Sequence, residues 1–363
     1  MIRQLRRLTQ PVPALGQDVA CIAVYAHERN GQWVPQSAAE QGYEGVACLD
    51  DAARGAVLYS EIWKRHRFDW ARTEAEALLR FTCAMQMDDG AFVNFIGDWD
   101  GRRQLETPTS RPGDGPWHAR AMHALACGLS AFGDDRLAAA FEAGLDRLDR
   151  PTPYLDVRAV AVLAALEFWQ TTPTRRVADR ALAWAEEIMA ARIGDVLPDR
   201  AGDANIHLWG HLQEAALART GMEFGRDDLV QAAARSADAV LAPAAQLAFP
   251  GPRSLAFEVS CTVAGLDALA AATEEARYRE SAALARAWFD GRNAACDPVY
   301  DRVRGRVFDG IDGTRVSRNS GAESNIEGGL ALVDALPWDA YAVQVLTPAS
   351  KRVAGSQLGL SES

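Results

Sequence analysis

The chain has 363 residues, of which 48% are apolar and 24% are charged, a composition typical of a soluble globular protein with a substantial core. Its formal net charge of −11 argues against the broad basic face that duplex nucleic acid requires and against binding to anionic membranes. The six cysteines form no C-x-x-C pair, and we expect them to be reduced thiols. No apolar stretch follows the basic N-terminal segment, and no uninterrupted apolar run reaches the roughly 18 residues of a membrane span. We therefore expect a cytoplasmic protein.

Residues 1–42 contain no pair of helical segments, and we predict that they form an N-terminal arm. Residues 19–25 are mildly β-like, and the sequence GQWV at 31–34 indicates a turn followed by an edge strand. We expect this arm to wrap around the domain that follows it or to fill an opening in that domain.

From residue 43 onward, helical segments of two types alternate in pairs. The second member of each pair is amphipathic: in 134–149, for example, Leu137, Phe141 and Leu145 recur at four-residue spacing, and mostly charged residues lie between them. Such a helix buries one face and exposes the other. Amphipathic helices are predicted at 69–87, 134–149, 175–193, 226–243, 274–291 and 338–346.

The first member of each pair is apolar on every side after its opening turns. Residues 159–166 read AVAVLAAL, and a helix that is apolar all round must be buried all round. Helices of this type are predicted at 43–66, 116–132, 154–171, 206–220, 254–272 and 321–336. We therefore predict an all-α (α/α)6 barrel over residues 43–350, with an inner ring of helices inside an outer ring. Residues 351–363 are polar and rich in Gly and Ser, and we expect a flexible tail there.

The long connections all follow amphipathic helices, whereas the links within a pair are short. The long loops are 88–115, 194–205, 244–253 and 292–320. In a ring of hairpins these loops lie on one face, at the N-terminal ends of the inner helices. The inner helices also carry their polar residues in their opening turns, so these residues converge at one mouth of the ring, where the helix dipoles favour anions. We interpret this mouth as the functional site, although acids there could also act only as helix caps or in structural ion pairs.

Three local sequences carry a resemblance to a known group of proteins. They are GYEGVACLDDAAR at 42–54, MDDGAFVNF at 87–95 followed by WHARA at 117–121, and VYDRVRGRVFDG at 299–310 leading to NSGAES at 319–324. Over roughly residues 42–338 the chain resembles six-hairpin glycosidase-like (α/α)6 toroids, in particular bacterial helical toroid domains associated with glycosyltransferases and glycoside hydrolases.

The resemblance implies a small β-hairpin before the last inner helix, a carbohydrate or related small-molecule substrate, and a glycosyltransferase as a candidate partner. The sequence departs from the pattern before helix 116–132. Such domains often carry acidic and serine residues there, whereas this chain has GDGPWH at 113–118, so Asp114 is the candidate for the acid.

Glycoside hydrolysis needs two carboxyl groups, one to protonate the leaving oxygen and one to activate water or attack carbon. Burial in an apolar ring can supply the raised pKa that the proton donor needs. Asp51 and Glu323 are the predicted catalytic pair because they begin the first and last inner helices, which become neighbours when the ring closes. The sequence does not assign which of the two is the acid.

The other polar and aromatic residues of the mouth are predicted to bind substrate. Tryptophans could provide stacking platforms and arginines could hold a uronate or a phosphate, although packing and structural ion pairs explain them equally well. The candidates are Asp50, Asp89, Trp99, Asp114, Trp117, His118, Arg120, Asp156, Arg158, His207, Trp209, His211, Glu258, Arg318, Asn319 and Glu327.

His207 and His211 are four residues apart, which would place them on one face of the predicted helix 206–220. Two histidines are too few to hold a metal ion, and we predict neither a metal nor a cofactor. Histidines in such a ring can also act as acid–base groups in a sugar epimerase. The alternatives to glycoside hydrolysis are therefore a toroid epimerase or cyclase, and a non-catalytic glycan-binding or scaffold toroid.

Overall fold

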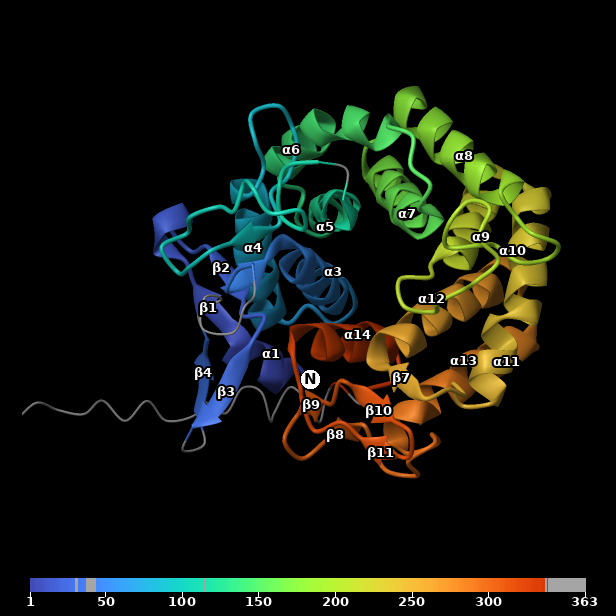
Figure 1. Cartoon of the computed structure of the whole chain (residues 1–363). Helices are drawn as coiled ribbons and strands as arrows, with labels where there is room; N and C mark the ends of the chain where they lie inside the picture. Colours follow the sequence, from blue (N-terminus) through green and yellow to red (C-terminus); the bar gives the residue numbers. More distant parts are fainter. Residues whose placement is uncertain (30–31, 37–43, 114, 337, 339–363) are drawn as a thin grey trace, which may run out of the picture.

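The computed structural model describes residues 1–29, 32–36, 44–113, 115–336 and 338. Its helices form two concentric rings (Figure 1). The inner ring consists of α3 (Leu49–His66), α5 (Pro116–Phe132), α7 (Leu155–Thr171), α9 (Gln213–Phe224), α12 (Ala256–Thr273) and α14 (Ala322–Leu332). Helix α14 packs against α3 and closes the inner ring, so the predicted (α/α)6 barrel is confirmed.

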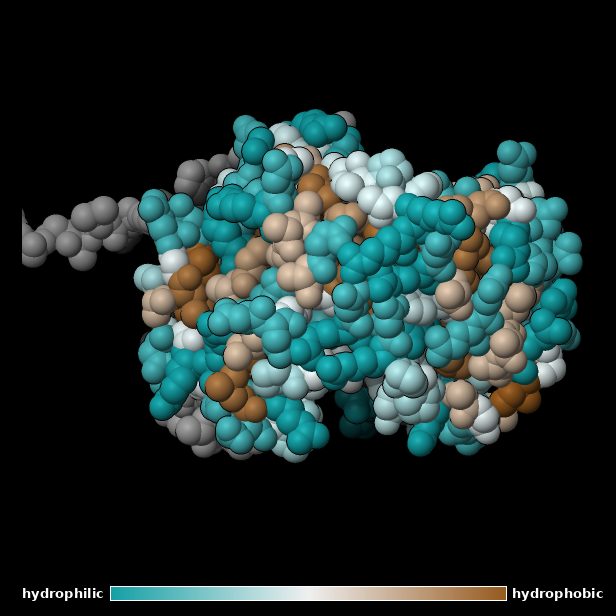
Figure 2. Space-filling model, turned by 90° about the horizontal axis from the view of Figure 1, so that it is seen from above, coloured by the Kyte–Doolittle hydropathy of each residue, from teal (hydrophilic) through white to brown (hydrophobic). Residues whose placement is uncertain are grey.

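The outer ring covers the inner helices with amphipathic ones. It consists of α4 (Asp69–Ala84), α6 (Asp135–Leu145), α8 (Arg175–Ala190), α10 (Asp227–Ala239), α11 (Leu241–Gln246) and α13 (Ala276–Arg286). In α8, Val177, Trp184 and Ile188 are buried. Figure 2 views the ring from the side of α6 and α8 and shows mainly hydrophilic side chains, with hydrophobic ones between them. The predicted outer helix 338–346 lies, apart from Trp338, outside the described residues.

The N-terminal arm contains a helix that the sequence analysis did not predict. Helix α1 (Ile2–Leu8) buries Ile2, Leu5 and Leu8 and packs against α14. The segment is short and carries three arginines, so its sequence alone does not predict a helix. The packing of its apolar face against α14 stabilises the helix. After α1, strand β1 (Thr9–Pro11) pairs with β2 (Ala20–Ile22), and β3 (Ala26–Arg29) pairs with β4 (Gln32–Pro35).

The close approach of α14 to α3 depends on a glycine. A Cβ atom on Gly329 would lie 2.5 Å from a methyl carbon of Leu58, a distance that real Cβ contacts do not show. A larger residue would push α14 away from α3, and these two helices carry the predicted catalytic pair.

Helix α12 is long and apolar enough to cross a membrane by length and composition, and it alone passes that test within the described part of the chain. It is an inner helix, and most of it is buried inside the ring. A core helix of this kind passes the test without spanning a membrane.

Short strands fix where inner helices begin. Strand β5 (Ala47–Cys48) runs directly into α3 and pairs with β6 (Phe95–Ile96), and β7 (Arg253–Leu255) runs into α12. Strand β7 pairs with β10 (Gly310–Asp312), which also pairs with β11 (Arg315–Val316). The hairpin implied before the last inner helix is present as β8 (Tyr300–Asp301) and β9 (Arg306–Val307).

Two inner helices begin later than predicted. Helix α3 begins at Leu49 because the preceding residues enter β5. Helix α9 begins at Gln213, since Gly210 has a φ of 78°, outside the helical region. His207 and His211 therefore do not share a helical face, and that prediction is wrong.

Candidate active site at the mouth of the ring

The first turn of α3 holds two adjacent aspartates in fixed positions at the mouth. The Cys48 thiol caps the helix by accepting a hydrogen bond from the backbone N–H of Asp51 (3.4 Å). The side-chain oxygen of Asn94 accepts a hydrogen bond from the backbone N–H of Asp50 (3.1 Å). Both carboxylates therefore lie at the positive end of the α3 dipole.

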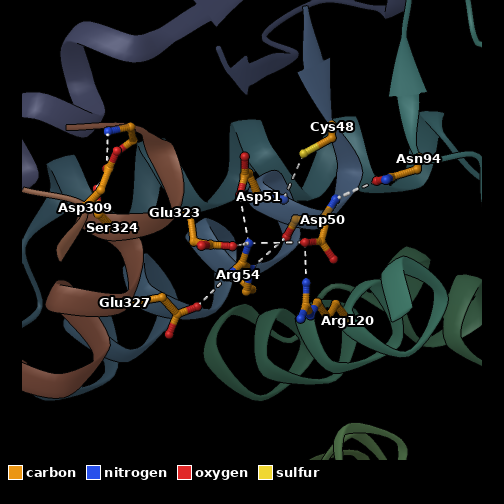
Figure 3. Close-up of polar contacts among 11 residues, drawn as sticks. Cys48, Asp50, Asp51, Arg54, Asn94, Arg120, Asp309, Glu323, Ser324 and Glu327 are labelled. Carbon is orange, nitrogen blue, oxygen red and sulfur yellow. Dashed lines mark hydrogen bonds and ion pairs between the residues drawn. The ribbon is translucent and has the colours of Figure 1, made fainter. Parts of the chain in front are cut away.

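Arg54, one turn further along α3, is the centre of the site (Figure 3). Its Nη2 atom donates to Asp50 (3.1 Å), Asp51 (2.8 Å) and Glu323 (3.2 Å), and its Nη1 atom donates to Glu327 (2.6 Å). The guanidinium is almost completely buried. Closure of the ring thus places the first turns of α3 and α14 beside the same arginine. Asp51 and Glu323 are therefore neighbours, as expected.

A second arginine joins the cluster from α5. Arg120 forms an ion pair with Asp50, and the ring of Phe257 lies 5.5 Å from its guanidinium carbon and 4.9 Å from that of Arg54. The two arginines face four carboxylates, so the cluster carries excess negative charge. One oxygen of Asp50, Oδ1, is buried and has no hydrogen-bond partner within the described residues.

The cluster separates the pKa values of the two adjacent aspartates. Burial raises the pKa of Asp51 to about 6; Arg54 opposes this rise, whereas the charges of Asp50 and Glu323 add to it. Burial would also raise the pKa of Asp50, but Arg120 and Arg54 outweigh that effect and lower it below the ordinary value. One aspartate is thus disposed to hold a proton near neutral pH while its neighbour stays ionised.

Glu323 and Glu327 differ in their access to solvent. The side chain of Glu323 is 49% exposed, whereas that of Glu327 is 3% exposed and burial raises its pKa. Asp309 holds the first turn of α14 in place, because its Oδ1 accepts hydrogen bonds from the Ser324 hydroxyl (2.8 Å) and the Gly321 backbone N–H (3.1 Å). Glu323 is therefore an accessible carboxylate on a firmly positioned turn.

Two cavities meet at Arg54 and Phe257. The outer one, of about 370 Å³, lies at the mouth, and its lining includes Arg253 and four acidic residues, Asp50, Asp51, Asp309 and Glu323. The inner one, of about 310 Å³, combines aliphatic side chains such as Val160 and Leu163 with the charged groups of Arg120 and Glu327. The charged groups of the acid cluster therefore face both cavities.

Several predicted site residues have packing roles. The Trp117 indole N–H donates to the carbonyl of Phe92 (3.0 Å), and the His118 ring is buried with Nε2 3.1 Å from the carbonyl oxygen of Gly144. Arg158 is buried, pairs with Glu187 (2.9 Å) and donates to the carbonyls of Leu148 and Arg150. These contacts fasten α5 and α7 to the outer helices α6 and α8 and to the segments that follow α4 and α6.

Other predicted residues lie on the periphery of the loops. Asp89 pairs with Arg147, and Arg318 pairs with Asp297 (2.8 Å). Trp99 is partly buried against the core, and the side chain of Asn319 is exposed. Asp114 lies outside the described residues.

His211 is fully buried in a polar cluster of its own. It lies 2.6 Å from Asp199 and 3.0 Å from Glu214, which also accepts a hydrogen bond from Ser236 (2.5 Å). Burial would lower the pKa of His211, but Glu214 and Asp199 raise it to about 10. This protonated histidine ties the loop before α9 to α9 and α10.

The remaining candidates form a second group at the mouth. Asp156, whose pKa is raised by burial, accepts a hydrogen bond from the backbone N–H of Val157 (2.8 Å), and Glu258 accepts one from that of Leu255 (2.9 Å). His207 and Trp209 stack on each other with ring centroids 3.9 Å apart.

The sequence analysis assigned no catalytic or binding role to Arg54, Phe257, Asp309 or Ser324. Arg54 was expected at the mouth, and its role could have been assigned, because it follows Asp51 by three residues and Asp50 by four, the spacings that place side chains on one helical face. Asp309 and Ser324 meet only through the fold of the loop before α14, and no local pattern indicates their contact.

No protein-family model and no curated protein matches this chain. Solved structures do match it. The cellobiose 2-epimerase from Spirochaeta thermophila is 15% identical, with 78% of this chain and 85% of that chain covered and a TM-score of 0.62. A family 76 glycoside hydrolase from a bovine Bacteroides thetaiotaomicron strain is 13% identical, with coverage of 87% and 72% and a TM-score of 0.59.

A further match is an inactive variant of an α-1,6-mannanase from a Salegentibacter species, in complex with α-1,6-mannotriose. It is 10% identical, with coverage of 78% of this chain and 88% of that chain and a TM-score of 0.57. At these identities the likeness establishes the shared fold, the six-hairpin (α/α)6 toroid.

Proposed function

We propose that this protein is a carbohydrate-active enzyme that hydrolyses glycosidic bonds at the mouth of the toroid. The observation that carries the proposal is the pairing of Asp51 and Glu323 on a single nitrogen of Arg54. Asp51 is buried with a raised pKa, as a proton donor requires, and Glu323 is exposed and therefore accessible to a substrate.

The closeness of the two carboxylates leads us to propose a retaining mechanism. Their oxygens bound to Arg54 lie 2.8 and 3.2 Å from the same nitrogen and are therefore at most about 6 Å apart. Retaining enzymes have the closer carboxyl pair, with roughly 5–5.5 Å between the groups against roughly 6.5–9.5 Å in inverting ones. Asp51 donates its proton to the glycosidic oxygen as Glu323 attacks the anomeric carbon. Water then cleaves the glycosyl–Glu323 ester, and the Asp51 carboxylate accepts the proton of that water.

The arginines position the attacking carboxylate and keep the stabilising one ionised. Arg54 contacts Glu323 directly, and together with Arg120 it holds the pKa of Asp50 below its usual value. The negative charge of Asp50 stabilises the oxocarbenium-like transition state beside it. Asp50 is also the second candidate for the nucleophile, since the matched mannanase variant described as inactive has asparagine in place of two adjacent aspartates.

Epimerisation is the competing function, because several matched structures are sugar epimerases. Two histidines are held in structural contacts: His118 lies against the Gly144 carbonyl, and His211 is enclosed between Asp199 and Glu214. His207 at the mouth and His123 in the inner cavity are the candidate bases for epimerisation. We prefer hydrolysis because Asp51 and Glu323 meet on one nitrogen of Arg54.

The test is incubation of the purified protein with a panel that includes α-1,6-manno-oligosaccharides and cello-oligosaccharides, followed by proton NMR of the products. We expect cleavage with retention of the anomeric configuration, and loss of cleavage in Asp51→Asn. A change at the reducing sugar without bond cleavage would replace the proposal by epimerisation. Absence of any reaction across the panel would refute an enzymatic role on these sugars.

A further inference from the structure

The loop that precedes α9 carries a stacked pair of aromatic rings at the mouth. The rings of His207 and Trp209 are 3.9 Å apart with an interplanar angle of 10°, and Trp209 is 44% exposed. An exposed indole on a monomeric surface is a frequent element of recognition sites. Nothing in the mechanism proposed above uses this pair.

The stack is preorganised by hydrogen bonds. His207 Nδ1 lies 2.9 Å from the carbonyl oxygen of Trp209, and the His207 backbone N–H donates to Asp199 (2.8 Å). Asp199 is itself held by the buried His211. The aromatic plane is therefore fixed before any ligand arrives, which reduces the entropy that binding has to overcome.

The depression beside this stack and the cavity of the acid cluster share a lining residue. A depression of about 550 Å³ is lined by His207, Trp209, Leu247 and Glu258, and it shares Arg253 with the cavity that contains Asp51 and Glu323. The loop also approaches the centre of the site directly. A Cβ atom on Gly210 would lie 4.0 Å from the ring of Phe257, which packs against Arg54.

Building on the hydrolytic function proposed above, we propose that the His207–Trp209 stack is a second sugar-binding subsite and that the substrate is an oligosaccharide spanning from Asp51 across Arg253 to Trp209. The C–H face of a pyranose packs on the indole, and its hydroxyls bond to Arg253 and Glu258. One cation and one carboxylate line this depression close to the stack, so it suits a neutral sugar rather than a uronate.

Binding measurements in the turnover-blocked Asp51→Asn background test this proposal without requiring catalysis. Isothermal titration calorimetry is performed with α-1,6-linked mannose oligosaccharides and with cello-oligosaccharides of two to five units. We expect affinity to rise at least tenfold with chain length in one series, and the ratio of pentasaccharide to disaccharide affinity to fall toward one when Trp209→Ala is added.

The matched control is Trp169→Ala, which removes another partly exposed tryptophan. Trp169 lies near the C-terminal end of the inner helix α7, the end away from the mouth. This variant should keep the chain-length dependence. If Trp209→Ala also keeps it, the second subsite is refuted while hydrolysis at the mouth stands. If no oligosaccharide of either series binds, both the subsite and the proposed function are refuted for these sugars.

Discussion

The two ends of the inner ring contain similar charged residues but arrange them differently. At the mouth, four carboxylates share Arg54 and one of them also contacts Arg120. At the rear, where the inner helices end, Lys64 lies between Glu61 (3.1 Å) and Glu167 (2.8 Å), and Arg219 also contacts Glu167 (3.3 Å). Carboxylates compete for a cation at the mouth, whereas cations surround a carboxylate at the rear.

The protonation of the acids reflects this difference. Burial would raise the pKa of Glu167, but Lys64 and Arg219 lower it to about 2, whereas the pKa of Asp51 rises to about 6. The rear cluster also resembles a metal site, because ligand atoms of Glu61, Cys127 and Glu167 lie within 4.8 Å of one another. The ammonium of Lys64 already supplies the positive charge there. The rear cluster therefore stabilises the ring, and the mouth holds the acid that the proposed function uses.

The largest expected effect comes from removing the proton donor. Asp51→Asn should lower kcat by about 10³-fold, within the usual contribution of a general acid, and leave the melting temperature unchanged or higher because it removes one of four crowded carboxylates. Glu323→Gln should reduce turnover similarly, and the double variant should be little worse than either single variant because the two act in one step. Steady-state kinetics and thermal melts check this, and full activity of both single variants would contradict it.

Removing the shared cation should destabilise the fold. Arg54→Met should reduce the free energy of unfolding by about 3 kcal/mol at pH 7, since it leaves buried carboxylates without their partner. Without Arg54 the folded-state pKa values of these acids rise, so they bind protons as the pH falls and the deficit relative to wild type should shrink by pH 5. Urea unfolding of both proteins at pH 5 and pH 7 measures the deficit. An equal deficit at the two pH values would mean that the loss of Arg54 does not raise the pKa values of these carboxylates.

The matching change at the rear should affect stability alone. Glu167→Gln should reduce the free energy of unfolding by about 2 kcal/mol and leave kcat within twofold of wild type. The pKa of Glu167 is lowered in the folded state, so its contribution is complete above its unfolded value of 4.5 and disappears as the pH falls toward about 2. Unfolding curves between pH 3 and 7 test this dependence, and a large loss of turnover would show that the rear takes part in catalysis.

The last prediction changes no residue and concerns the pH profile of the wild-type enzyme. Since the proposed mechanism uses Asp51 in its protonated form, kcat/KM should fall about tenfold per pH unit above about 6. Initial rates from pH 4 to 9 give this profile. A plateau that continues to pH 8 would assign the acid to another residue.

The ring of helices could be predicted from the sequence because the pattern of apolar residues is periodic within each helix and the pair of helices is repeated along the chain. The bounds of α5 agree with the predicted 116–132, and the expectation that ring closure brings Asp51 and Glu323 together follows from helix order alone. Local patterns failed where distant contacts decide the outcome. The apolar segment 206–212 resembles a helix, but Gly210 and the buried contact between His211 and Asp199 hold it as a loop.

The same limit applies to the substrate-binding candidates. His118 and Arg158 stand in the opening turns of inner helices, as Asp51 does, and nothing near them in the sequence distinguishes their roles. Their partners are backbone carbonyls such as those of Gly144 and Leu148, which become acceptors only after the outer helix α6 packs beside them. Placement at the mouth was therefore predictable, but the direction of each side chain was not.

The most direct test of the difference between the two ends is the titration of the carboxyl groups themselves. Carbon-detected NMR of protein labelled at aspartate and glutamate carboxyl carbons reports each pKa, and spectra of Asp51→Asn and Glu167→Gln assign the two signals. We predict that the signal lost in Asp51→Asn titrates near pH 6 and that the signal lost in Glu167→Gln stays ionised below pH 3. Titration of Asp51 at or below pH 4 would contradict its role as the proton donor of the mouth.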